Sequence, residues 1–114
     1  MFMKATLVIS LFALCLCPVS CSQANPQAAL QKLKDAGNGI QGGDGQSMET
    51  AIVLTGKTTH VVSQEYDIFQ ALYGFRPEMQ GFMKKDGHYY DVLSGDGKTL
   101  YFDITAYWQH QYGK

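Results

Sequence analysis

The fold is decided by residues 79–105, which read MQGFMKKDGHYYDVLSGDGKTLYFDIT. Asp86-Gly87 is a tight-turn signal, because a type I′ hairpin needs positive φ at both central residues and this pair tolerates it. Residues 94–97 supply a second reversal, expected as a four- or five-residue loop. Apolar residues then alternate with polar ones and share one side of the last segment: Leu100, Phe102 and Ile104. The stretch predicts three short strands in a sheet with one buried face.

Two helices are expected ahead of this sheet. Asn25 and Pro26 have the residue types of a helix N-cap and first helical position, and Gly37 ends that helix. Its apolar face is weak, so we expect it to dock loosely or to act as a spacer. A second helix, with Ser63 as N-cap and Gly74 as its left-handed stop, is expected to pack across the sheet.

The segment between the helices adds one strand. Residues 37–47 contain five glycines, which favours a flexible linker or a structured turn. Residues 51–54 are a short apolar run typical of a buried strand. The aromatic tail, residues 106–112, fits either a last helical turn or an edge strand. We therefore predict an α+β domain over residues 48–114, with a three- to four-stranded, mostly antiparallel sheet and one helix across it, preceded over residues 21–47 by a helix and a Gly-rich linker.

The beginning of the chain has the organisation of a signal peptide, assigned to residues 1–20. One positive charge in residues 1–4 precedes an apolar run over residues 5–17, which is too short to span a bilayer comfortably. The small residue before Cys21 resembles a bacterial lipobox, in which the cysteine takes a lipid, although Pro18 stands where leucine is usual. The alternative is ordinary signal-peptidase cleavage near Ala24.

These two interpretations give two locations. Lipidation at Cys21 predicts a periplasmic protein anchored to the outer membrane, whereas cleavage near Ala24 predicts a soluble periplasmic or secreted one. All three cysteines of the chain lie within its first 21 residues, so no disulfide is expected in the folded domain. The domain must then be held by its core alone.

Charge excludes some partners. Residues 22–114 carry eight Lys and Arg against ten Asp and Glu, without a basic stripe. Nucleic acid is therefore not an expected partner, and a membrane is expected only through the N-terminal lipid.

The polar residues give little sign of catalysis. No metal or cofactor is expected, because the three histidines are far apart and stand in no ligand spacing. Asp91 and Asp103 occupy similar places in adjacent strands, and on one face they would form a carboxyl pair suited to acid/base chemistry. Each could instead cap a loop or meet a lysine on a solvated face, which is the interpretation we favour. The chain is therefore not expected to be an enzyme.

Aromatic residues are more abundant than a core of this size needs. Tyrosine and tryptophan anchor protein interfaces and stack on sugar rings. The best candidates for an exposed contact are Tyr101, Tyr107, Trp108 and Tyr112, and Asp91 and Asp103 remain candidate binding residues.

Several short motifs together resemble a group of small uncharacterised exported proteins of Gram-negative bacteria. They are Gly43-Asp44-Gly45 before Ala51-Ile52-Val53, then Glu65-Tyr66, Tyr90-Asp91-Val92 and Tyr101-Phe102-Asp103-Ile104. The resemblance implies an envelope protein and transfers no catalytic or binding residue. We expect a non-catalytic module that binds an envelope protein or polymer. The alternatives are an inhibitor or immunity-type protein against an envelope hydrolase or toxin, and a small carboxylate-dependent hydrolase.

Overall fold

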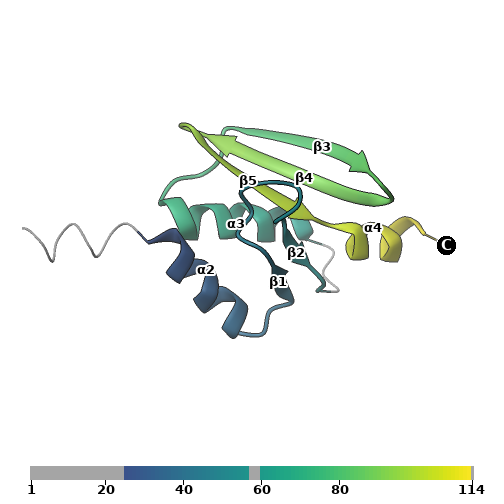
Figure 1. Ribbon diagram of the computed structural model, residues 1–114, viewed down its shortest axis with the longest axis horizontal. Coiled ribbons are helices and arrows are strands. Elements are labelled where there is room, and N and C mark those ends of the chain that lie inside the picture. The colour runs from purple at the N-terminus through teal and green to yellow at the C-terminus, as the bar shows by residue number, and fades with distance from the viewer. Residues whose placement is uncertain (1–24, 57–59, 114) are drawn as a thin grey trace, which may run out of the picture.

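The structure, a computed structural model, describes residues 25–56 and 60–113 (Figure 1). The predicted signal peptide and the predicted lipidation site, Cys21, lie outside the described residues. The elements in chain order are α2 (Pro26–Asp35), β1 (Ile40–Gly42), β2 (Ile52–Leu54), α3 (Val61–Tyr73), β3 (Met79–Lys85), β4 (His88–Gly95), β5 (Lys98–Asp103) and α4 (Thr105–Tyr112).

The strands form one five-stranded sheet in the order β1-β2-β5-β4-β3. β2 runs parallel to β5, and the other neighbours are antiparallel. The predicted α+β class is confirmed, but the sheet is larger than expected and mixed, and three helices rather than two lie within the described residues. The extra strand is β1, which forms inside the glycine-rich segment because Ile40 is buried against the core.

The helix boundaries follow capping and burial. In α2 the Asn25 side chain accepts a hydrogen bond from the backbone N–H of Ala28 at 3.1 Å, as an N-cap should. α3 ends at Gly74, with φ of 86°, as predicted. Its predicted start is wrong, because the helix begins at Val61 rather than after Ser63. Val61 is buried, so core packing outweighs the capping preference of the serine.

The core lies between the sheet and its helices. α3 packs across β4 and β5, while α2 packs on α3 and β1 (Figure 1). Leu30 of α2 is only 1% exposed and shares a core with Ile52 and Phe102, so the expected loose docking of this helix is wrong. Residues 26–42 therefore pack as part of the same folded unit as the sheet.

Two tight turns set the register of the β3-β4-β5 meander. Asp86 and Gly87 have φ of 52° and 82°, which confirms the predicted type I′ hairpin. Asp96 and Gly97 have φ of 47° and 77°, and Gly95 pairs with Lys98. The second turn therefore also has two residues, not the four or five expected.

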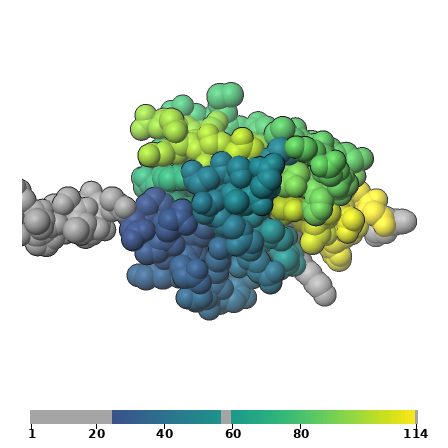
Figure 2. All heavy atoms as spheres, viewed as in Figure 1, coloured from purple at the N-terminus to yellow at the C-terminus, as the bar shows by residue number. Residues whose placement is uncertain are grey.

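The tail forms α4, which resolves the choice between helix and edge strand. Figure 2 shows this C-terminal helix against the β3-β4 hairpin at one end of the molecule.

A loop, residues 43–51, lies on the face of the sheet that carries the Tyr90 side chain. It brings Met48 and Glu49 near Tyr90. Within the described residues, no helix is both long and apolar enough to cross a membrane.

Candidate functional site

Four aromatic rings stack where α4 meets the β3-β4 hairpin, and we call them the aromatic surface: Phe82, Tyr89, Trp108 and Tyr112. The Trp108 ring centroid lies 5.0 Å from that of Phe82 and 4.8 Å from that of Tyr89, with interplanar angles of 29° and 16°. The Tyr112 ring adds a tilted contact, 4.6 Å from Trp108. Stacked pairs of this kind stabilise beyond their buried area, so the surface is held in one arrangement.

The outer members of this cluster are its accessible part. Phe82 is 49% exposed and Tyr112 is 63% exposed, whereas Trp108 and Tyr89 are half-buried. The Lys84 Nζ lies 5.3 Å from the Tyr89 ring centroid, a cation–π contact. Because Trp108 already contacts three other rings, it anchors α4, and Phe82 and Tyr112 are the more exposed rings of the aromatic surface.

Only some of the predicted aromatic candidates belong to this surface. Trp108 and Tyr112 do. Tyr107 instead packs against the core, half-buried. Tyr101 is paired with Val92, next to the buried pair of Asp91 and Phe102, and therefore points to the other face of the sheet.

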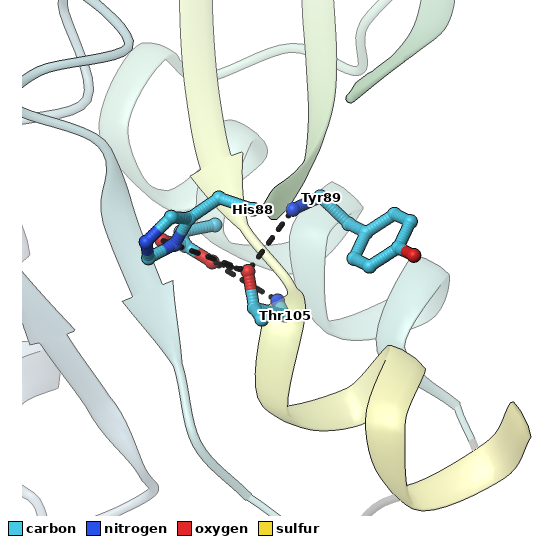
Figure 3. Close-up of polar contacts among 4 residues, drawn as sticks. His88, Tyr89 and Thr105 are labelled. Carbon is cyan, nitrogen blue, oxygen red and sulfur yellow. Dashed lines mark hydrogen bonds and ion pairs between the residues drawn. The ribbon is translucent and has the colours of Figure 1, made fainter. Parts of the chain in front are cut away.

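Asp103 has a structural role at the start of α4, where it contacts two of the residues labelled in Figure 3, His88 and Thr105. Its carboxylate accepts hydrogen bonds from the Thr105 backbone N–H at 3.0 Å and from the Thr105 hydroxyl at 2.6 Å. Its other oxygen lies 3.0 Å from the Nδ1 of His88, and the Thr105 hydroxyl oxygen accepts from the Tyr89 N–H at 3.0 Å. The network ties the first turn of α4 to the beginning of β4, and thereby places Trp108 over Tyr89.

This network is not an activated nucleophile. A Ser- or Thr-based nucleophile donates its hydroxyl proton to a histidine, which a carboxylate orients. Here the short contact runs from the Thr105 hydroxyl directly to Asp103, while the histidine Nδ1 is 3.3 Å from the hydroxyl oxygen. The arrangement is that of an Asx turn leading into the helix, whose N-cap residue is Ile104.

A buried carboxyl pair joins α3 to β4. Glu65 is fully buried, and neither of its carboxyl oxygens has a hydrogen-bond donor within the described residues. Asp91 of β4, 4% exposed, lies beside it. Burial, and then a hydrogen bond to Asp91 together with its negative charge, raise the pKa of Glu65 to about 10.

A proton shared between Glu65 and Asp91 explains why the Glu65 carboxyl oxygens have no other hydrogen-bond partner. Burial also raises the pKa of Asp91, while the hydrogen bond from Glu65 opposes that rise. Glu65 is therefore the protonated partner at neutral pH and donates to the Asp91 carboxylate. Since Glu65 is closed off from solvent, the pair holds a proton inside the core and offers no surface to a substrate.

The pairing of Asp91 with Asp103 does not occur. Asp91 is opposite Phe102, and Asp103 is opposite Tyr90. Because consecutive residues point to opposite faces of a sheet, the two carboxyl groups lie on different sides of it. The carboxyl pair that the hydrolase hypothesis requires is therefore absent, and Asp91 is paired with Glu65 instead.

The described part of the chain offers few other features that could bind a metal ion or a ligand. Its residues include no group of three His, Cys, Asp or Glu side chains arranged to hold a metal ion. A shallow hollow of about 130 Å³ on the opposite face is lined by Met48, Glu49, Lys85, Asp86 and Tyr90, which is small beside typical ligand pockets. Comparisons with protein-family models, curated proteins and solved structures gave no match for this chain.

Phe82, Tyr89 and Glu65 were not among the predicted candidates, although the sequence carried a signal for Phe82 and for Glu65. The Asp86-Gly87 turn sets Lys84 opposite Tyr89, so Phe82 is a diagonal neighbour of Tyr89 on the same face. Glu65 lies at helical spacing with Ile68, Phe69 and Leu72, which marks it as part of the buried stripe.

Proposed function

We propose that this protein is an exported, non-catalytic binding module of the bacterial envelope, and that it binds its partner through the aromatic surface. The observation that carries the proposal is the pair of exposed rings, Phe82 and Tyr112, on a rigid base formed by Tyr89 and Trp108. Rings fixed in this way bind at low entropic cost, because they do not have to be ordered on binding.

A protein partner fits this surface better than a sugar polymer. Sugar binding needs an aromatic face free to stack on a pyranose ring, but the Trp108 ring is already in contact with three others. Protein interfaces have exposed aromatic side chains at their centre with charged residues around them. Lys84 stands in that position beside Tyr89. Export itself is proposed from the N-terminal sequence.

Photo-crosslinking in the living host tests the proposal. A photoreactive amino acid placed at position 82 or 112 should give the same discrete adduct with one envelope protein. The matched control is position 32, because Lys32 is exposed on α2, away from the aromatic surface. The Tyr112→Ala substitution should lower the yield of the adduct from position 82 by about fivefold or more, as expected for a residue that contributes to binding. Equal adducts from positions 32, 82 and 112 would show that this surface is not the binding site.

A further inference from the structure

β3 is an edge strand whose outer backbone groups have no neighbour among the described elements (Figure 1). The backbone N–H of Ile104 donates to the carbonyl of Tyr89 at 2.8 Å, so the backbone groups of Tyr89 point toward β5. In an antiparallel ladder these directions alternate along the strand, and the next residue, Tyr90, therefore bonds β3. Tyr90 is opposite Met83.

The same alternation identifies the backbone N–H and C=O groups of β3 that are not bonded to β4. The β3 residues that bond β4 are Met79, Gly81, Met83 and Lys85. The N–H and C=O groups of Gln80, Phe82 and Lys84 consequently point outward along the free edge. Such an edge is a template on which another strand can pair.

The side chains of β3 are also exposed to solvent. Every residue of the strand is exposed. Of the five large apolar side chains that are exposed in the described part of the chain, three belong to β3: Met79 at 68%, Phe82 at 49% and Met83 at 42%. Native edge strands are usually protected by charges, but here the lysines stand at one end only and residues 79–83 are uncharged.

The sequence of this edge is complementary to itself in the antiparallel direction. If Gly81 is placed opposite Gly81 of a second copy, Met79 falls opposite Met83, and Glu78, in the bend just before the strand, comes beside Lys84; each of these pairs occurs twice. Opposed residues of unlike charge and opposed apolar residues both stabilise antiparallel pairs. Gln80 and Phe82, whose backbone groups point outward, then become hydrogen-bonded partners across the interface.

We propose that two copies of this chain pair antiparallel through β3, about a two-fold axis at Gly81, so that their sheets become one continuous sheet. The axis runs perpendicular to the sheet and therefore places both aromatic surfaces on the same face. From strand geometry the two Phe82 Cα atoms lie roughly 8 Å apart. The dimer is inferred from the strand edge and does not depend on the proposed function, although it would present two partner-binding surfaces side by side.

A cysteine at the axis tests this register. Opposed residues that are not hydrogen-bonded partners lie about 4.5 Å apart between Cα atoms, which is within disulfide range. A Cβ at Gly81 meets nothing within 4 Å, so Gly81→Cys is sterically free. The full chain with Cys15, Cys17 and Cys21 changed to serine provides the background without other thiols. Under copper–phenanthroline oxidation, Gly81→Cys should form a disulfide-linked dimer.

Met83→Cys is the matched control, because this residue lies on the same strand and face but opposite Met79 of the second copy. Its two thiols are then too far apart to join, and it should stay largely unlinked. Equal linking at positions 81 and 83 would indicate random collision or aggregation, and no linking at position 81 at 100 µM protein would overturn the dimer. Linking of Gly81→Cys to a different protein, and not to itself, would also overturn self-pairing.

A charge exchange tests the same interface independently. Glu78→Lys places two lysine pairs across the axis, and the rate of linking through Gly81→Cys should fall by about tenfold. Adding Lys84→Glu recreates opposite charges and should restore the rate. If the double substitution links no faster than Glu78→Lys alone, the proposed register is wrong.

Discussion

Replacing Glu65 with glutamine should remove a pH dependence that is built into the core. An ordinary glutamate has a pKa of 4.5, whereas that of folded Glu65 is about 10. Between these values the folded chain holds a proton that the unfolded chain has lost, so stability falls as pH rises. Each pH unit costs about 1.4 kcal/mol, which amounts to about 3 kcal/mol at pH 7. The contribution is complete below pH 4.5 and is lost as pH rises through about 10.

Glutamine keeps the shape of the side chain and can donate one hydrogen bond to Asp91 without binding a proton. Its second amide N–H adds a donor at a place where neither carboxyl oxygen of Glu65 has a partner, and a buried donor left without an acceptor costs about 1–3 kcal/mol. The Glu65→Gln protein should therefore be similar in stability to the wild type near pH 6. By pH 8 to 9 it should be more stable by about 2 kcal/mol or more.

Urea unfolding, followed by the fluorescence of the single tryptophan, Trp108, measures this effect between pH 6 and 9. The wild type should lose about 1.4 kcal/mol per pH unit, and Glu65→Gln should be nearly flat. Asp67→Asn is the control, because Asp67 is exposed on the same helix and its loss should keep the wild-type slope. A wild-type free energy of unfolding that is constant over this range would refute a protonated Glu65.

Two further predictions concern a glycine and the leader. Gly45 has φ of +79°, and a Cβ there would lie 2.9 Å from Leu100 Cδ2; Gly45→Ala should therefore lower the free energy of unfolding by about 1–3 kcal/mol. In the same urea assay Gly81→Ala, which meets no neighbour, should change it little, and equal effects of the two would contradict this packing. The intact mass of the protein from host membranes should match a chain that begins at Cys21 and carries acyl groups. A bare chain beginning near Asn25 in the soluble fraction would show that it is not lipidated.

Local signals predicted the parts of the fold that depend on neighbouring residues. The Asn25 cap, the Gly74 stop and the Asp86-Gly87 turn each require a particular residue at one backbone position. The structure has all three where expected. The α+β class followed from these signals together with the two periodicities.

Register and long-range pairing were harder to predict. The apolar run in β2 shows that the strand is buried, but it contains nothing that selects β5 as a parallel neighbour. Treating residues 94–97 as a longer loop left the register of β4 and β5 open, and a shift of one residue moves every side chain to the other face. That is why Asp91 was considered with Asp103, when its partner is on α3.

The same contrast between local sequence signals and long-range packing applies to the residues of the candidate site. Trp108 and Tyr112 were predicted as contact residues from composition, because the tail is more aromatic than a core requires. Phe82 was missed, since its place beside Trp108 depends on how α4 returns to the hairpin. That return is fixed by the contacts of Asp103 with Thr105 and with His88, and His88 lies 15 residues away in sequence.

The parallel pairing of β2 with β5 also has a consequence for biosynthesis. Ile52 pairs with Phe102, so β2 has no neighbour on that side until β5, about fifty residues later in the chain, has been made. The sheet cannot close on the ribosome while its last strand is still in the exit tunnel. A chain that stays open in this way suits passage through a translocation pore, which requires an extended polypeptide. If the protein is exported as proposed, this order of strands delays folding until the chain has crossed the membrane.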